Sequence, residues 1–329
     1  MRVLGPAEIA RCLPMGNAIA AMRAAFAAHA EGSVRAPPRA VLRTGGKRGA
    51  TLVMPAALES DKPPLLTVKV VSVFPDNPSG VVPSIHSTLI AVDASTGIPL
   101  ALLDGASLTA IRTAAACGLA TDLLARPASA VLAVFGSGVH ARTQVRAVRA
   151  VRPIEEVRIF NPNRESARTM VEELEAAESG GVVFRSAGSS ADALSGADVA
   201  CAATTSRTPV FRDADVPDGM HINAIGSFLP EEREVPGATV ARARVFVDDR
   251  HSALEEAGDL LIPMAEGLFG EDHIRCDLGS LVLGRAQGRS SAREVTFFKA
   301  VGLAVQDVVA TQAVLREVQR LGLGQRIDW

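Results

Sequence analysis

The chain has 329 residues, of which 48% are hydrophobic and 21% charged, and its formal net charge is −2. This composition is typical of a folded protein with one large core or two smaller ones, and it lacks the basic footprint of a nucleic-acid-binding protein. No apolar run approaches the roughly 18 residues that span a bilayer, and the first residues lack the apolar segment of a signal peptide. We therefore expect a cytoplasmic protein without nucleic-acid or membrane partners.

The cysteines and histidines give no sign of a metal site. The four cysteines are scattered without a CxxC pair, and the six histidines form no HxxxH or HxH pair. Disulfide and zinc frameworks are both disfavoured by this spacing. We expect buried thiols in a reducing compartment and no bound metal.

The first 120 residues mix predicted helices and strands. A helix is expected at 15–32, with apolar residues on one face and a glycine at its end. Short apolar and β-branched runs divided by turn residues predict four strands, and a long helix follows at 107–124. The four strands are expected at 51–54, 65–74, 87–93 and 99–104, with a turn at 75–80.

Two of these elements carry a cation in apolar company. Lys69 lies within the strand at 65–74, and Arg112 lies in a helix of otherwise small, apolar residues. Because an unpaired buried charge is costly, Lys69 reaches the surface from an edge strand, pairs internally or faces a ligand. Arg112 suits bidentate recognition of a carboxylate or phosphate, with a structural ion pair as the alternative. Arg39 follows two prolines, and on this pattern alone a surface loop position is favoured.

Residues 131–141, with the sequence VLAVFGSGVHA, form the most informative motif in the chain. Five apolar residues suit a buried parallel strand, and glycines and a predicted helix follow at once. A strand, a glycine turn and a helix place free backbone N–H groups against a pyrophosphate. Gly136 permits the tight turn, Gly138 lets the phosphates approach, and Ala141 lets the helix pack closely. The motif predicts a dinucleotide site.

From residue 131 onward, predicted strands alternate with predicted helices, which indicates a parallel sheet. The strands are expected at 131–135, 157–160, 182–184, 199–203, 221–225 and 245–247, and the helices at 139–150, 164–177 and 190–195. A last helix at 302–321 is expected to return to the first domain, because its valines need an apolar partner. The predicted domains are therefore 1–120 with 303–329, and 121–302.

The residue after the second strand indicates which dinucleotide is bound. NAD-binding folds place an acidic residue about 20 residues past the glycines, where it holds the ribose 2′-hydroxyl. Asn161 occupies this position, and Asn163 and Arg164 follow. A carboxylate here would repel a 2′-phosphate, whereas Asn161 does not and Arg164 is able to pair with it. NADPH is therefore favoured over NADH; the alternative is a solvated Arg164 and the use of NAD.

Taken together, these residues resemble the ornithine cyclodeaminase/μ-crystallin family over nearly the whole chain. The ordered matches are Pro38-Arg39, Met54-Pro55-Ala56, Lys69 with Pro75 and Gly80, Leu103-Asp104-Gly105, 109–115, Gly136-Ser137-Gly138, 221–226 and 298–307. The resemblance implies an α/β fold with a Rossmann doubly wound parallel sheet domain. It also implies a second α+β domain for substrate binding and dimerisation, and a homodimer.

The resemblance carries roles onto individual residues. The family's carboxylate-binding cations fall on Arg39, Lys69 and Arg112, and Ser84 matches a family Ser or Thr near the substrate. Family threonines and a segment near the nicotinamide supply further cofactor contacts. With the residues above, the expected cofactor set is Thr113, Gly136, Ser137, Gly138, Val139, His140, Asn161, Asn163, Arg164, Thr204, Ala300, Val301 and Gly302.

Two departures from the family pattern narrow the expected reaction. Cyclodeaminases carry a glutamate where this chain has Leu52 and an aspartate where it has Phe228, and the archaeal alanine dehydrogenase branch has arginine at the first position. Without the two acids ornithine cyclisation is disfavoured, and we expect both apolar residues to form a pocket for a small ring. His86, the Phe228 segment and the run at 256–260 resemble the branch that reduces cyclic ketimines, and μ-crystallin shares the leucine and prefers NADPH.

The resemblance therefore implies NAD(P)H-dependent reduction of Δ1-pyrroline-2-carboxylate or Δ1-piperideine-2-carboxylate to L-proline or L-pipecolate. Lys69 is the first candidate to protonate the imine nitrogen, followed by His86 or a water molecule, and a structural histidine is the alternative for His86. Three other functions remain open. These are an open-chain amino-acid dehydrogenase or N-alkyl amino-acid reductase, a cyclodeaminase with relocated acids, and an NADPH-dependent binding protein like μ-crystallin.

Overall fold

The computed structural model describes residues 1–43, 49–59, 63–74, 76–77, 81–177 and 180–328. The chain divides into two compact units: unit 1 is Met1–Arg112 with Leu303–Trp329, and unit 2 is Thr113–Gly302. The division falls within helix α3 (Gly105–Leu124), earlier along the chain than the predicted boundary at residue 120. Pro75 and Gly80 of the predicted turn lie outside the described residues. Among the helices that are described, none is long and apolar enough to cross a membrane.

Unit 1 is built on an eight-stranded sheet of mixed direction. Its strands are β1 (Arg2–Leu4), β2 (Val34–Arg35), β3 (Ala40–Arg43), β4 (Ala50–Leu58), β5 (Leu65–Val73), β6 (Ile85–Asp93), β7 (Pro99–Asp104) and β16 (Gln325–Arg326). The order is β16-β1-β7-β6-β5-β4-β2, and β3 pairs with β4. Strands β4 to β7 form an antiparallel meander, in which one face is buried and the other more exposed.

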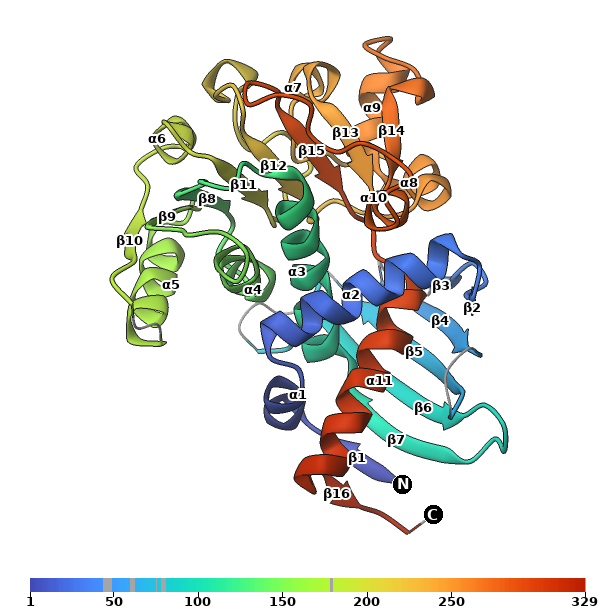
Figure 1. Ribbon diagram of the computed structural model, residues 1–329. Coiled ribbons are helices and arrows are strands. Elements are labelled where there is room, and N and C mark those ends of the chain that lie inside the picture. Colours follow the sequence, from blue (N-terminus) through green and yellow to red (C-terminus); the bar gives the residue numbers. More distant parts are fainter. Residues whose placement is uncertain (44–48, 60–62, 75, 78–80, 178–179, 329) are drawn as a thin grey trace. The chain divides into compact units, whose positions relative to one another are not determined.

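Helices α1 (Pro6–Cys12), α2 (Met15–Ala30) and α11 (Ala304–Leu321) lie wholly within unit 1, and the first part of α3 also belongs to it. Helix α11 contacts α1, α2, β4 and β5, and Figure 1 shows it beside α2 along the sheet. Its valines are buried, and it ends at Gly322, whose φ of +67° suits a left-handed helix cap. The end of the chain thus completes the core of the unit in which the chain begins.

Unit 2 is built on a second eight-stranded sheet, in the order β10-β9-β8-β11-β12-β15-β13-β14, and every neighbouring pair is parallel. Its strands are β8 (Val131–Phe135), β9 (Glu156–Phe160), β10 (Val183–Ser186), β11 (Val199–Ala202), β12 (His221–Ala224), β13 (Arg244–Val247), β14 (Ile274–Asp277) and β15 (Thr296–Lys299). Its helices are α4 (Val139–Arg149), α5 (Arg164–Ala177), α6 (Ser190–Leu194), α7 (Gly237–Arg242), α8 (Arg250–Glu256), α9 (Gly258–Ala265) and α10 (Leu278–Val282). The predicted α/β fold with a doubly wound parallel sheet is confirmed.

The register of unit 2 aligns the carboxyl ends of its central strands. The last residues of five neighbouring strands pair with one another in register across the sheet. In the order β9, β8, β11, β12 and β15, they are Phe160, Phe135, Ala202, Ala224 and Lys299. The chain leaves the sheet directly after each of them, so the following loops share one edge, which we call the carboxyl edge. The strand order reverses between β8 and β11, and ligands of doubly wound sheets bind at such a switch point.

Candidate functional site

Lys69 lies near the middle of β5 and is only 2% exposed. Side chains alternate between the faces of a strand, and Lys69 points to the same buried face as Thr67. Its Nζ lies 2.7 Å from Oδ2 of Asp307 and 3.5 Å from Oγ1 of Thr109. Of the three environments that the sequence left open for Lys69, the structure shows an internal ion pair.

Arg112 joins the same carboxylate from α3. Its Nε donates to Oδ1 of Asp307 at 3.0 Å, and its Nη1 donates to Oε1 of Gln306 at 2.7 Å. Gln306 in turn accepts a hydrogen bond from the backbone N–H of Leu303 at 3.0 Å, which orients its amide. We call Lys69, Arg112, Gln306 and Asp307 the cation cluster.

The cation cluster holds two positive groups and one negative group in a buried place. Burial by itself would raise the pKa of Asp307, but Lys69 and Arg112 hold that pKa below its usual value, so the carboxylate is ionised. Burial also lowers the pKa of Lys69 to about 8; Asp307 opposes this shift, and the charges of Arg112 and Arg39 add to it. The cluster keeps an excess positive charge at neutral pH, and a carboxylate ligand would balance it.

The other predicted residues of unit 1 lie in or directly before strands β3, β4 and β6. Arg39 is half-buried just before β3, close enough for its charge to act on Lys69. Leu52 pairs with Val71 across β4 and β5, which places it on the same sheet face as Lys69. Ser84 is exposed just before β6.

His86 is not part of the cation cluster. It is exposed on β6 and pairs with Ser72 of β5, three residues from Lys69, so the two side chains leave opposite faces of the sheet. The sequence predicts His86 as an alternative to Lys69 for donating the proton. That role stays a prediction, and the sheet geometry of the chain argues against it.

In unit 2 the glycine turn has the backbone geometry that its motif predicts. Gly136 has a φ of +101°, and a Cβ there would lie 2.5 Å from the carbonyl oxygen of Ala203, so only glycine fits. Gly138 is the N-cap of α4, and a Cβ there would meet nothing within 4 Å. Ala141 is fully buried against the sheet, while Val139 is exposed. An open helix N-terminus beside a switch point fits a dinucleotide pyrophosphate.

The residues after β9 lie directly beside this turn. The amide nitrogen of Asn161 donates to Oγ of Ser137 at 2.7 Å, and its oxygen accepts from the N–H of Asn163 at 2.9 Å. The side-chain oxygen of Asn163 accepts from the N–H of Ser166 at 3.2 Å, in the first turn of α5, so this residue also caps a helix. Arg164 is exposed, with its Nη2 3.5 Å from the carbonyl oxygen of Gly188.

Two further segments of the predicted cofactor set lie at the same carboxyl edge. Thr204 follows β11, and its backbone N–H and hydroxyl both donate to Glu234, at 2.6 and 2.7 Å. The N–H groups of Val301 and Gly302, after β15, donate to Asp248 at 2.9 and 2.7 Å. Both acids are buried, and the sequence pattern predicts neither. Thr113 and His140 are half-buried, at the start of unit 2 in α3 and in the first turn of α4.

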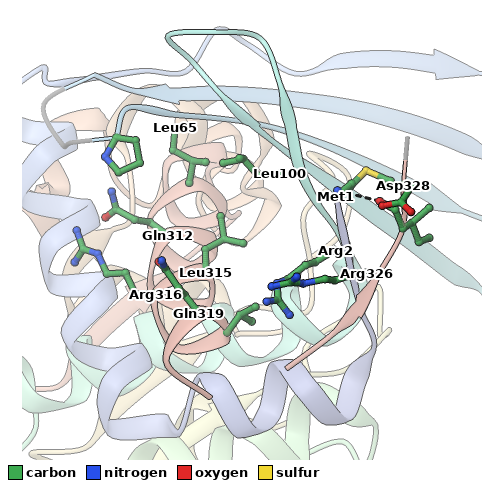
Figure 2. Close-up of a pocket in the computed structure, with 13 residues that line it drawn as sticks. Met1, Arg2, Leu65, Leu100, Gln312, Leu315, Arg316, Gln319, Arg326 and Asp328 are labelled. Carbon is green, nitrogen blue, oxygen red and sulfur yellow. Dashed lines mark hydrogen bonds between the residues drawn. The ribbon is translucent and has the colours of Figure 1, made fainter. Parts of the chain in front are cut away.

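Two other features of the described residues bear on ligand binding. No group of three or more His, Cys, Asp or Glu side chains among them is arranged to hold a metal ion. A cavity of about 530 Å³ opens in unit 1 between the later turns of α11 and strands β1 and β16 (Figure 2). Arg2 and Arg326, which pair across these strands, lie together in it, and none of the predicted site residues lines it. The cavity is therefore separate from the cation cluster.

Comparisons with known proteins show the family of this chain. The model of the ornithine cyclodeaminase/mu-crystallin family matches residues 2–320. The chain belongs to that family. It is 36% identical over 330 residues to a Delta(1)-pyrroline-2-carboxylate reductase of Bacillus cereus, covering 100% of both chains. The resemblance that the sequence predicts is confirmed.

Two solved structures are close to this one over their full lengths. The Delta(1)-pyrroline-2-carboxylate reductase of Thermococcus litoralis, in complex with NADH and L-proline, has a TM-score of 0.94 and 34% identity, covering 99% of this chain and 100% of that one. An archaeal alanine dehydrogenase dimer with bound NAD has a TM-score of 0.91 and 30% identity, covering 100% and 99%. Family members of this fold thus include proteins that bind nicotinamide dinucleotides.

Proposed function

We propose that this protein is an NAD(P)H-dependent oxidoreductase that reduces a cyclic imine carboxylate, Δ1-pyrroline-2-carboxylate or Δ1-piperideine-2-carboxylate, to L-proline or L-pipecolate. The observation that carries this proposal is the cation cluster, in which Lys69 and Arg112 share one buried carboxylate and leave a positive charge unbalanced. The likeness to Delta(1)-pyrroline-2-carboxylate reductases supports the choice of substrate class.

Unit 1 binds the substrate in this proposal. The carboxylate of the imine lies against Lys69 and Arg112, and Arg39 and Ser84 contribute from the segments before β3 and β6. Asp307 holds both buried cations in place, so they are oriented before the substrate arrives, which lowers the cost of ordering it. Leu52 offers an apolar surface to the ring from the same sheet face, in place of an acid that ornithine cyclisation needs.

Lys69 delivers the proton that the reaction consumes. Because the pKa of Lys69 is about 8, its ammonium group is mostly protonated at neutral pH. It nevertheless releases a proton more easily than an ordinary lysine does. The imine nitrogen takes this proton as the C=N bond becomes a C–N bond, and Lys69 regains a proton from solvent. When bound, the reduced nicotinamide supplies the hydride for the imine carbon.

Unit 2 holds the dinucleotide along its carboxyl edge. The turn at 136–138 and the first turn of α4, with Val139 and His140, take the pyrophosphate, while Asn161, Asn163 and Arg164 face the adenosine ribose. Thr113, Thr204 and the segment 300–302 contact the nicotinamide half. NADPH is preferred because the residue directly after β9 is Asn161 and not an acid, and NADH is also accepted, as in the Thermococcus litoralis complex.

The protein assembles as a homodimer through unit 1. The archaeal alanine dehydrogenase of the same fold, described as a dimer, supports this assembly. Size-exclusion chromatography with light scattering measures it directly, and a monomer at micromolar concentration would contradict it.

The decisive experiment follows absorbance at 340 nm with four substrate sets: Δ1-pyrroline-2-carboxylate, Δ1-piperideine-2-carboxylate, pyruvate with ammonia or an amine, and ornithine. A ketimine reductase consumes one NAD(P)H per cyclic imine and leaves the other two sets nearly unchanged. A cyclodeaminase releases ammonia from ornithine with no net consumption of NADH, and a pure binding protein turns over none of the four. Turnover of pyruvate with ammonia above that of both imines would replace the proposal by an open-chain dehydrogenase.

A further inference from the structure

Glu234 is a fully buried acid whose two oxygens hold two different loops of unit 2. One oxygen accepts from the backbone N–H and the hydroxyl of Thr204, at 2.6 and 2.7 Å. The other accepts from the backbone N–H groups of Gly226 and Ser227, at 2.5 and 3.1 Å. The carboxylate is thus saturated with four donors that come from the loops after β11 and β12.

These two loops pack as closely as backbone allows. Strands β11 and β12 are parallel neighbours, with Ala202 paired to Ala224, so their loops leave the carboxyl edge side by side. A Cβ on Gly226 would clash with the carbonyl oxygen of Thr204 and with the Glu234 carboxylate. The spacing between the loops is therefore set by this carboxylate and by a residue without a side chain.

A second group of buried charges holds Glu234 itself. Asp259 accepts from the backbone N–H groups of Glu234 and Val235, at 2.7 and 2.9 Å. Its other oxygen accepts from Oγ of Ser227 and from Nζ of Lys299, both at 2.7 Å. Lys299 also donates to the carbonyl oxygen of Ser227 at 2.5 Å. Each member is hydrogen-bonded, so the network is rigid.

Lys299 connects this network to a third loop. It is the last residue of β15, and the segment 300–302 follows it directly. The N–H of Ala300 donates to the carbonyl oxygen of Ala224 at 3.2 Å, which joins the loops after β12 and β15. The loops that follow β11, β12 and β15 are thus tied together by buried polar contacts.

The electrostatics suit a rigid support better than a reacting group. Burial raises the pKa of Glu234, and the charge of Asp259 raises it further, while Lys299 and the hydrogen bonds from Thr204 oppose the shift. A carboxylate that already accepts four hydrogen bonds has no lone pair left for a substrate. Its contribution is the placement of the backbone around it.

We propose that Glu234, through Asp259 and Lys299, is a positioning residue for the dinucleotide, which sets the spacing of the three loops that hold its nicotinamide half. The inference rests on the proposed assignment of these loops to the cofactor. In this proposal Glu234 does not touch the cofactor, yet it strongly affects the affinity for the cofactor.

Glu234→Gln tests this role at nearly unchanged volume. Whichever way the amide is turned, its NH₂ group faces a backbone N–H of one loop, so one of the two loops loses its acceptor. We expect the Kd for NADPH and NADH, measured by the fluorescence of the reduced nicotinamide, to rise by at least about tenfold. We also expect faster hydrogen exchange of the amides of Thr204, Gly226 and Ser227, read from peptides that cover 203–206 and 225–228.

Two variants serve as controls. Glu266→Gln changes an exposed acid of unit 2 that accepts from Arg233 at 2.8 Å, and it leaves both the Kd and the exchange as in wild type. Glu234→Asp keeps the charge but is too short to reach both loops, so it weakens binding as Glu234→Gln does. Recovery of wild-type affinity in Glu234→Asp would mean that charge alone matters, and it would overturn the positioning role.

The outcomes separate this inference from the proposed function. Wild-type protein that binds neither dinucleotide overturns the proposed function and this inference with it. Wild-type protein that binds, together with a Glu234→Gln variant of the same Kd, overturns the positioning role alone. If Glu234→Gln does not fold, Ser227→Ala removes one hydroxyl link to Asp259 and Lys299 and is expected to raise the Kd about threefold. An unchanged Kd in that variant contradicts the proposal.

Discussion

In the cation cluster of unit 1 the charged side chains contact one another, whereas Glu234 and Asp248 of unit 2 contact mainly backbone N–H groups. Lys69 and Arg112 converge on Asp307, and their excess positive charge is available to a ligand. In unit 2, Glu234 and Asp248 use their oxygens to fix N–H groups of the loops at the carboxyl edge. In the proposed function, unit 1 therefore recognises its ligand with side chains, and unit 2 presents a backbone surface to its ligand.

Different kinds of substitution therefore separate substrate binding from cofactor binding. In a site made of side chains, truncation removes the recognition group itself and leaves the fold of the other unit intact. In a site made of backbone, the informative changes are the glycines that line it and the buried acids that hold it. Variants of the two units test this division between substrate binding and cofactor binding.

The largest effect is expected from Arg112→Ala. Truncating one member of a buried, hydrogen-bonded charge group costs about 2–5 kcal/mol, so kcat/KM for the cyclic imine should fall on the order of 100-fold. The Kd for NADPH should stay within about twofold of wild type, since unit 2 is unchanged. Arg35→Ala is the matched control, because Arg35 is exposed and pairs only with Glu59 among the described residues. A parallel loss of imine reduction and NADPH affinity would contradict the division of substrate binding and cofactor binding between the two units.

A pair of glycine variants tests the backbone site. Gly138→Ala is expected to keep the melting temperature, since its φ is −83° and the space around its Cβ is open, yet to weaken dinucleotide binding about tenfold or more. Gly136→Ala is expected to lower the melting temperature as well, because its φ of +101° and a 2.5 Å contact strain the turn. Calorimetry and fluorescence titration measure both. Undiminished NADPH binding by Gly138→Ala would contradict the assignment of the pyrophosphate to this turn.

The pH dependence of ligand binding tests the side-chain site. Lys69 is charged below its pKa of about 8 and neutral above it. The affinity for a carboxylate ligand should therefore fall as the pH rises above about 8, and the decrease should approach about tenfold per pH unit. Pyrrole-2-carboxylate, a planar analogue whose ring nitrogen does not titrate in this range, reports this by calorimetry. Lys69→Arg should abolish the inflection, since a guanidinium stays charged. An inflection that persists in this variant would assign the titration to another group.

The smallest effect is expected from Asn161, the residue after β9 that is proposed to face the adenosine ribose. Asn161→Asp places a negative charge beside the turn, which repels a 2′-phosphate and accepts from a ribose 2′-hydroxyl. The ratio of kcat/KM with NADPH to that with NADH should fall about 5–10-fold. Steady-state kinetics with both coenzymes measures the ratio, and an unchanged value would contradict the assignment of Asn161 to coenzyme choice.

Local sequence patterns predict most of the regular elements. The strand at 131–135, the strand at 99–104 and the helix at 164–177 match β8, β7 and α5 at both ends, because each has a clear apolar pattern. Strand β15 is not predicted although it lies inside the sheet, because its four residues end in a lysine that is typical of exposed positions. Helices α7 to α10 are short and carry no sustained helical period.

Local patterns indicate only part of the candidate site. Lys69 and Arg112 stand out because a cation in apolar company needs a partner, yet Asp307 lies 195 positions beyond Arg112, and local patterns do not report such pairing. Glu234 is hidden for a different reason. It ends the run Glu231-Glu232-Arg233-Glu234, which resembles a solvated loop, and only burial distinguishes its last member. Long-range pairing and burial are what the sequence alone does not carry.

The return of α11 to unit 1 has a consequence for the order in which the chain folds. During synthesis, all of unit 2 emerges before residues 303–321, which supply Gln306 and Asp307 to Lys69 and Arg112. Until then, burial of these two cations lacks its counter-ion and is strongly disfavoured. Unit 2 is therefore able to fold from contiguous chain, whereas unit 1 begins first and is completed last.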